Sequence, residues 1–175
     1  MRLVVSVFLI PAYDEFVKFA FNRQEFENVA RSISPLLKKR QKTIAGAWWL
    51  GYRGDWRMAA TILVPQIEFL VSQVLEKKGV KVTYTHQGGM TETYMALSTL
   101  LELPEAKECL GETLWKELEL LFGAAPHLNL RNNMMHGLID DPGEGYYCPC
   151  DLYIWWMSMR LLLVEEVFFD AENAG

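Results

Sequence analysis

Apolar residues recur at helical spacing along most of this 175-residue chain, and the longest such run lies between Asp55 and Gly79. Asp55 is a suitable N-cap, and Gly79 suits the left-handed position at which helices commonly end. Pro65 lies inside the run, where it removes one backbone hydrogen bond and is expected to kink the helix. The spacing predicts a long core helix from Asp55 through Lys78. Its expected inward positions are Ala59, Ile62, Leu63, Ile67, Leu70, Val71, Val74 and Leu75.

Other segments repeat this periodicity and predict further amphipathic helices. These segments are Tyr13 to Phe26, Glu25 to Leu37, Thr91 to Leu101, Glu105 to Phe122 and the run capped by Asp151. The pattern predicts an all-α fold, a single helical bundle of about five or six helices. Residues 1–54 are expected to pack as an N-terminal helical segment on a core domain of residues 55–175, so that the chain forms one continuous globular unit.

The composition supports an ordered globular protein, because 51% of the residues are hydrophobic and 13% are aromatic. The opening MRLVVSVFLIPAY resembles a weak signal peptide, but it lacks a small-residue cleavage site and is too short to span a bilayer. A buried terminal element is the preferred interpretation, and no membrane partner is expected. Three cysteines, an odd number, favour a reducing compartment, and therefore a cytoplasmic location.

The residues that could bind a metal are few and badly spaced. Cys148 and Cys150 could hold a soft metal only if other ligands joined them, and His86, His127 and His136 lack zinc-motif spacing to that pair. No metal and no other cofactor are therefore expected. A metal-dependent hydrolase built around the two cysteines is kept as a weaker alternative, which stoichiometric zinc in the purified protein would support.

Charge is distributed unevenly along the chain. The net charge is −5, but residues 1–88 hold 13 Lys and Arg against 7 Asp and Glu, whereas residues 89–175 hold 4 against 15. A basic face from the first half could contact an RNA backbone. Its candidate residues are Lys38, Lys39, Arg40, Arg53 and Arg57. The alternative for the run from Lys38 to Lys42 is a solvated helix end.

The stretch LNLRNNMMHG, residues 128–137, places unusual polar residues in an apolar chain. Asparagine disfavours helix interiors because its amide competes for backbone groups. On a helix, Asn129, Asn132, Asn133 and His136 would form one stripe, with Leu128, Met134, Met135 and Leu138 on the other face. Arg131 would lie about 140° from His136 around the axis, although its long side chain could reach back across the helix.

These residue types suit RNA cleavage without a metal. Histidine can accept and donate protons near neutral pH, and arginine can hold the charge that develops on the phosphate. Asn132 could position the phosphate or fix the histidine tautomer. Because the stripe holds a single histidine, a two-fold dimer would supply both the acid and the base.

A purely structural interpretation also accounts for the stripe. Asn and His side chains can satisfy loop backbone groups, and Arg131 can neutralise Glu68 or the acidic residues near the C-terminus. A buried Glu68 would need such a partner unless it faces solvent.

The run from Arg131 to His136 resembles the Arg, polar residue, three variable residues, His motif of the HEPN superfamily. The longer pattern, ATILVPQIEFL from Ala59 followed by LNLRNNMMHGL from Leu128, is similar to one prokaryotic HEPN-like family of unknown function. The resemblance covers roughly residues 55 to 165. In it, Arg131 and His136 match the invariant pair, Asn132 matches the polar position, and Glu68 loosely matches an acidic position of the upstream helix.

The resemblance implies a helical bundle that dimerises through its motif-bearing helices and cleaves RNA without a metal, leaving a cyclic phosphate end. It implies a toxin or phage-defence effector acting on RNA such as tRNA, with an antitoxin or regulatory partner. In this scheme Asn129, Asn133 and Glu68 help to position the substrate. It also implies that such a domain commonly ends a longer protein.

Other HEPN-like domains imply a second hypothesis, a non-catalytic module that binds nucleotides or partner chains. The indoles of Trp48, Trp49, Trp155 and Trp156 could support a partner interface in that case. The alternative is that these tryptophans pack in the core, as aromatic residues at helical spacing mostly do.

Overall fold

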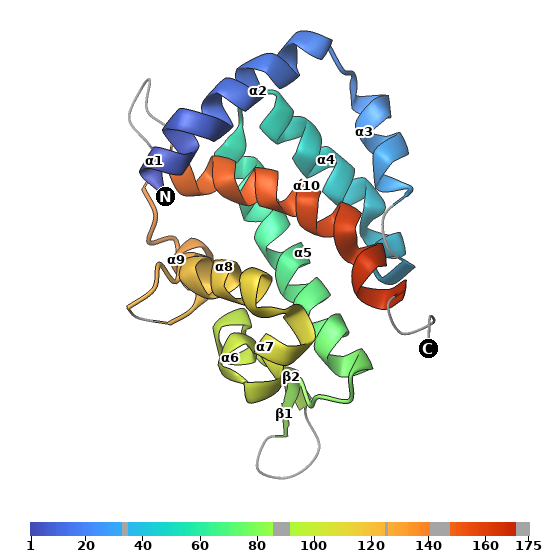
Figure 1. Cartoon of the computed structure of the whole chain (residues 1–175), viewed down its shortest axis with the longest axis vertical. Coiled ribbons are helices and arrows are strands. Elements are labelled where there is room, and N and C mark those ends of the chain that lie inside the picture. Colours follow the sequence, from blue (N-terminus) through green and yellow to red (C-terminus); the bar gives the residue numbers. More distant parts are fainter. Residues whose placement is uncertain (33–34, 86–91, 125, 141–147, 171–175) are drawn as a thin grey trace. The chain divides into compact units, whose positions relative to one another are not determined.

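The computed structural model describes residues 1–32, 35–85, 92–124, 126–140 and 148–170 (Figure 1). Helices account for most of these residues, which confirms the predicted all-α class. The chain divides into two compact units, a first unit of Met1–Gln66 with Asp141–Gly175 and a second unit of Ile67–Asp140. The predicted boundary at residue 55 stays a prediction.

The first unit joins the N-terminal helices to the last one (Figure 1). Its elements are α1 (Arg2–Val4), the π-helix η1 (Val5–Leu9), α2 (Ile10–Phe16), the 3-10 helices η2 (Val17–Phe19) and η3 (Pro35–Arg40), α3 (Arg23–Ala30), α4 (Gln41–Tyr52), the start of α5 (Trp56–Lys77) and α10 (Pro149–Asp170). Helix α4 packs against α3 and α10, and η1 also contacts α10. Residues distant in sequence thereby share one core.

Two tryptophans form the centre of the first unit. Trp48 on α4 and Trp155 on α10 are 1% and 0% exposed. The Trp48 indole donates to Ser158 Oγ at 3.1 Å, and the Trp155 indole donates to the Trp48 carbonyl at 3.0 Å. Both buried N–H groups are therefore satisfied. This confirms the core interpretation for these two residues, while Trp49 and Trp156 are half-buried.

The segment expected as one helix from Tyr13 to Phe26 is interrupted. Ala20 adopts a left-handed conformation, with φ of 51°, and ends η2. Asn22 then starts α3 with a capping box, because its Oδ1 accepts from the Glu25 N–H at 3.3 Å and Glu25 Oε2 accepts from the Asn22 N–H at 2.6 Å. The apolar spacing alone did not reveal this local cap.

Helix α5 confirms the long core helix. The Met58 N–H donates to Asp55 Oδ1 at 3.2 Å, as an N-cap requires, and Gly79 has a φ of 80° just beyond the end. Pro65 lies inside the helix without dividing it. By length and composition α5 could cross a membrane, but 61% of its most apolar window is buried inside the protein, as in the core helix of a globular protein. The cytoplasmic location stays a prediction.

The prediction that Asp151 caps the last helix was wrong, because α10 begins two residues earlier, at Pro149. Asp151 lies in the first turn of α10, and its Oδ2 accepts from Arg57 Nε at 2.7 Å, with side chains 3% and 18% exposed. Burial raises the pKa of Asp151, and the hydrogen bond and charge of Arg57 oppose that rise. This ion pair links α5 to α10.

Replacing Arg57 by alanine is expected to lower the free energy of unfolding by about 3 kcal/mol, because a buried carboxylate would lose its partner. Arg53→Ala is the matched control, since Arg53 is exposed and lies 5.7 Å from the Trp49 ring centroid, a contact worth about 1 kcal/mol or less. Urea unfolding would measure both. The deficit of Arg57→Ala should narrow as the pH falls towards about 4, because burial raises the pKa of Asp151 and the carboxyl becomes protonated in the folded chain. Equal losses for the two variants at pH 7 would contradict the assignment.

The second unit contains the rest of α5, a small hairpin and four short helices (Figure 1). Strands β1 (Thr83–Thr85) and β2 (Glu92–Tyr94) pair antiparallel, with Thr83 opposite Tyr94. The helices are α6 (Leu97–Glu102), α7 (Pro104–Leu110), α8 (Glu112–Phe122) and α9 (Leu130–Met135). Helix α8 contacts α6, α7 and α9, so it is the centre of this group.

Two predicted helices in this unit were wrong in part. The expected helix from Thr91 begins only at Leu97, because Glu92–Tyr94 pairs as a strand. The expected helix from Glu105 to Phe122 is broken at Gly111, whose φ of 77° is not helical. The described residues therefore form more and shorter helices than the five or six predicted. The connecting segment from Lys81 includes β1, and its part from 86 to 89 lies outside the described residues.

Candidate functional site

The polar stretch forms a short helix, α9, between two left-handed residues. Asn129, with φ of 48°, precedes the helix, and Gly137, with φ of 65°, follows it. The His136 N–H donates to the Asn132 carbonyl at 3.0 Å, and the Leu138 N–H donates to the Asn133 carbonyl at 2.8 Å. The stripe is therefore only partly helical, because its two outer members, Asn129 and His136, are cap residues.

The asparagines of the stripe differ in their contacts. Asn133 Nδ2 donates to the Leu128 carbonyl at 3.2 Å and so satisfies loop backbone, as the structural interpretation expected. Asn129, Asn132 and Asn133 are all partly exposed. Asn132 directly follows Arg131 and remains the candidate for positioning a substrate.

Arg131 forms a bidentate ion pair with Glu68 of α5. Its Nε lies 2.6 Å from Oε2 and its Nη2 lies 3.1 Å from Oε1, with side chains 29% and 20% exposed. A two-point contact of this kind fixes the orientation of the guanidinium plane. The structure thus brings together two predicted site residues that are 63 positions apart, and it supplies the arginine partner that a partly buried Glu68 requires.

His136 lies at the C-terminal end of α9 and is exposed. Within the described part of the chain its imidazole forms no hydrogen bond or ion pair, whereas His127 Nε2 lies 3.9 Å from Glu119 Oε1. The two described histidines of the second unit thus differ in their surroundings. A substrate or a second protein chain can reach the His136 imidazole without breaking a contact of that side chain.

The five cations proposed for an RNA backbone all belong to the first unit. Lys38 and Lys39 are exposed on η3, and Arg53 is exposed near Trp49. Arg40 Nη1 donates to Gln66 Oε1 at 2.9 Å, and Arg57 is engaged by Asp151. Arg131 and His136 belong to the second unit.

Apolar side chains are exposed around the motif. We call Leu120, Leu128, Met135 and Leu138 the motif-side apolar residues; they are 49%, 41%, 46% and 67% exposed. The sequence placed three of them on the helix face opposite the asparagines, but Leu128 and Leu138 lie outside α9. Grouped exposed apolar residues are typical of interaction surfaces.

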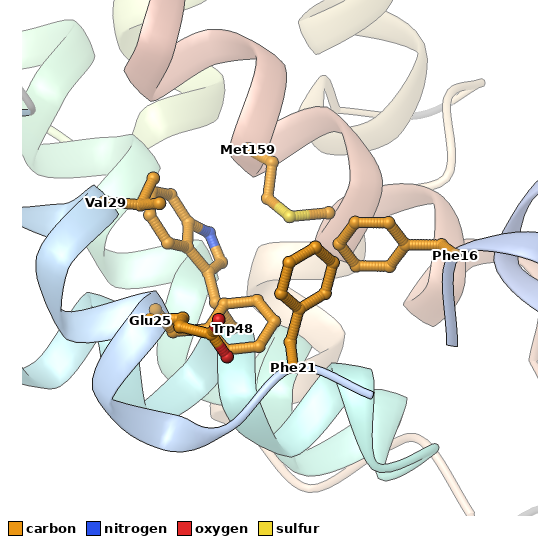
Figure 2. A pocket seen from close by; sticks show the side chains of 7 residues that line it. Phe16, Phe21, Glu25, Val29, Trp48 and Met159 are labelled. Atoms are coloured by element: carbon orange, nitrogen blue, oxygen red, sulfur yellow. The ribbon is translucent and has the colours of Figure 1, made fainter. Parts of the chain in front are cut away.

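A separate apolar pocket lies in the first unit and was not predicted. Figure 2 shows Met159 and the rings of Phe16 and Phe21 around it, and the Phe16 and Phe21 centroids are 5.2 Å apart. The pocket has a volume of about 240 Å³ and is lined by Phe16, Phe21, Glu25, Phe26, Val29, Trp48 and Met159. These residues come from α2, α3, α4, α10 and the connection before α3 that holds Phe21, so no local sequence pattern indicates the pocket. No cation lines the pocket, and it does not suit a phosphate.

The described residues contain no group of three or more His, Cys, Asp and Glu side chains that could hold a metal ion. His86 lies outside the described residues. Comparison with protein-family models, curated proteins and solved structures gives no match for this chain. The HEPN resemblance therefore stays a prediction that rests on the motif residues.

Proposed function

We propose that this protein is a HEPN-type, metal-independent endoribonuclease that acts as a homodimer, with the motif of Arg131 to His136 at the dimer interface. The observation that supports it best is the pairing of an oriented arginine with an accessible histidine on one short helix. Glu68 fixes the Arg131 guanidinium with two hydrogen bonds, and His136 is exposed at the end of α9. A toxin or phage-defence effector is the role that the resemblance favours.

The proposed chemistry needs one group to remove a proton and another to supply one. One His136 would accept the proton of the RNA 2'-hydroxyl as that oxygen attacks the adjacent phosphorus. The bond to the 5' oxygen breaks, and the His136 of the other protomer would donate a proton to that leaving oxygen. The products are a 2',3'-cyclic phosphate and a 5'-hydroxyl. A guanidinium has five N–H donors, of which two go to Glu68, so Arg131 can still hold the phosphate oxygens.

The motif-side apolar residues support the dimer. A two-fold contact uses the same patch on both protomers and would cover these side chains twice. Such a contact would also bring two copies of His136 near one another. An antitoxin or regulatory partner could compete for the same patch.

The parent protein is expected to cleave total RNA and purified tRNA in the presence of EDTA. End-group analysis should find cyclic phosphate at the 3' ends of the products, because the nucleophile is the substrate's own 2'-hydroxyl. RNA with 2'-O-methyl groups is the matched control and should stay intact. Cleavage that stops in EDTA, or products without cyclic phosphate, would overturn the proposed chemistry.

A second candidate function is a binding module without catalysis. The Arg131–Glu68 ion pair favours this function, because Glu68 already neutralises the guanidinium. The exposed motif-side apolar residues favour it as well. This alternative predicts no RNA products at any enzyme concentration. It also predicts a nucleotide or partner chain that protects His136 from chemical modification.

A further inference from the structure

Two cysteines stand together at the start of a long helix in the first unit. Cys148 immediately precedes α10, a helix of 22 residues, and Cys150 lies in its first turn. Both are free thiols of intermediate exposure. Their side chains are joined by a hydrogen bond, and Cys150 Sγ also lies 3.4 Å from Met1 Sδ. The proposed ribonuclease uses neither residue.

The surroundings make the two thiols chemically different. The hydrogen bond from Cys150 lowers the pKa of Cys148 to about 6, with help from the backbone N–H groups of Cys150 and Asp151, against burial and the Asp151 charge. The same hydrogen bond and burial raise the pKa of Cys150. Cys109, in the second unit, has its pKa raised by burial. Cys148 is therefore the thiol best able to act as a thiolate nucleophile at neutral pH.

The distance between the two residues is compatible with a disulfide. Positions two apart at the start of a helix have Cα atoms about 5.4 Å from each other, which falls inside the range that disulfides span. The existing thiol–thiol hydrogen bond already holds the sulfur atoms close. The Cys148 carbonyl accepts from the Asp151 N–H at 2.9 Å, so Cys148 is held against the first turn of α10.

We propose that Cys148 and Cys150 form a reversible dithiol–disulfide site that exchanges with small-molecule disulfides such as oxidised glutathione. Cys148 is the attacking residue and Cys150 is the resolving residue. Two cysteines alone do not complete a metal site, and no third ligand stands with them among the described residues.

The exchange proceeds in two balanced steps. The Cys148 thiolate attacks one sulfur of the small disulfide, forming a mixed disulfide and releasing one small thiolate. Cys150 then loses its proton to that thiolate and attacks Cys148 Sγ, which forms the Cys148–Cys150 bond and releases the second small thiolate. The protein loses two electrons and two hydrogens, and the small disulfide becomes two thiols after protonation by solvent.

Oxidised glutathione is the probe for the test, and intact mass with peptide mapping is the measurement. The parent should lose two hydrogens and gain a Cys148–Cys150 link that dithiothreitol reverses. Cys150→Ser should instead accumulate one glutathione on Cys148, because nothing resolves the mixed disulfide. Cys148→Ser should form no internal disulfide. A parent that stays reduced, or a Cys150→Ser variant that carries glutathione only on Cys109, would overturn the proposal.

Alkylation by iodoacetamide tests the roles separately from disulfide formation. In the parent, the rate at Cys148 should rise with a midpoint near pH 6, whereas Cys109, the internal control whose pKa is raised by burial, should react only at more alkaline pH. Cys150→Ala removes the thiol donor and should shift the Cys148 midpoint upward. A Cys148 profile that matches Cys109, or one that Cys150→Ala does not move, would contradict the assignment of the attacking residue.

Discussion

Replacing His136 by alanine is expected to lower RNA cleavage by about a thousandfold, within the range that one acid–base group commonly contributes. The variant would lack both the base and the acid, since the active centre of the proposed dimer takes one imidazole from each protomer. Folding should be unaffected, because His136 is exposed and its backbone hydrogen bond to Asn132 does not need the side chain. Single-turnover cleavage of a labelled tRNA, with circular dichroism to check the fold, is the measurement.

His127→Ala is the matched control for this experiment. His127 belongs to the same unit and to the segment just before α9, but its imidazole is near Glu119. Its removal should leave the cleavage rate within about twofold of the parent, because it supplies no proton in the proposed chemistry. Equal activity in the parent and His136→Ala would refute the site. Equal loss in both histidine variants would point to a structural cause.

Mixed dimers provide a sharper test of the two-histidine scheme. Combining inactive His136→Ala chains with inactive Arg131→Ala chains places an intact Arg131 and an intact His136 in one heterodimer. If both imidazoles are essential, this heterodimer should not recover any cleavage. In a second mixture, of parent with His136→Ala chains, the activity should fall in proportion to the fraction of parent homodimer that remains. Cleavage activity that instead falls linearly with the fraction of parent chains in this second mixture would show that each protomer acts independently.

Substituting Gly51 by alanine is expected to lower the free energy of unfolding by about 3 kcal/mol, the upper end of usual overpacking costs. A Cβ atom there would lie 2.1 Å from Trp155 Cδ1 and 2.2 Å from its Nε1. Trp155 is fully buried and its indole is held by the Trp48 carbonyl, so it cannot move aside without losing a buried hydrogen bond. The cost therefore falls on the contact between α4 and α10.

Gly46→Ala, on the same helix, is the matched control and should act in the opposite direction. A Cβ atom at Gly46 would meet no atom within 4 Å. Alanine is favoured over glycine in helices by about 1 kcal/mol, so this variant should gain stability. Urea unfolding followed by tryptophan fluorescence and circular dichroism would compare the three proteins. Similar midpoints for both variants would show that α4 and α10 do not approach as closely as the structure indicates.

The sequence was informative about the long helix and limited about the short ones. Helix α5 could be predicted from its apolar spacing, the Asp55 cap and the Gly79 stop, all of which act within a few residues. The hairpin at Glu92–Tyr94 could not, because a strand is stabilised by a partner strand and this segment also has helical spacing. The break at Gly111 was also missed, since a glycine inside a periodic run can be tolerated or can end a helix.

The sequence predicted which residues belong to the candidate site better than it predicted their contacts. The motif residues were identified from their types and spacing, and both interpretations of Glu68, facing solvent or pairing with arginine, remained open. The structure selects the ion pair with Arg131. It also assigns Arg57 to Asp151, 94 positions away, although Arg57 had been expected to contact RNA. The RNA role of the remaining basic residues stays a prediction.

By itself, the sequence determined the all-α class, the longest helix and the residues that could carry acid–base chemistry, because helix periodicity, caps and residue chemistry are local properties. The tertiary structure decided which charges neutralise one another and that Trp48 and Trp155 share a core. Those outcomes depend on which distant segments approach each other. A side chain's partner is set by that long-range packing, which neighbouring residues in the sequence do not encode.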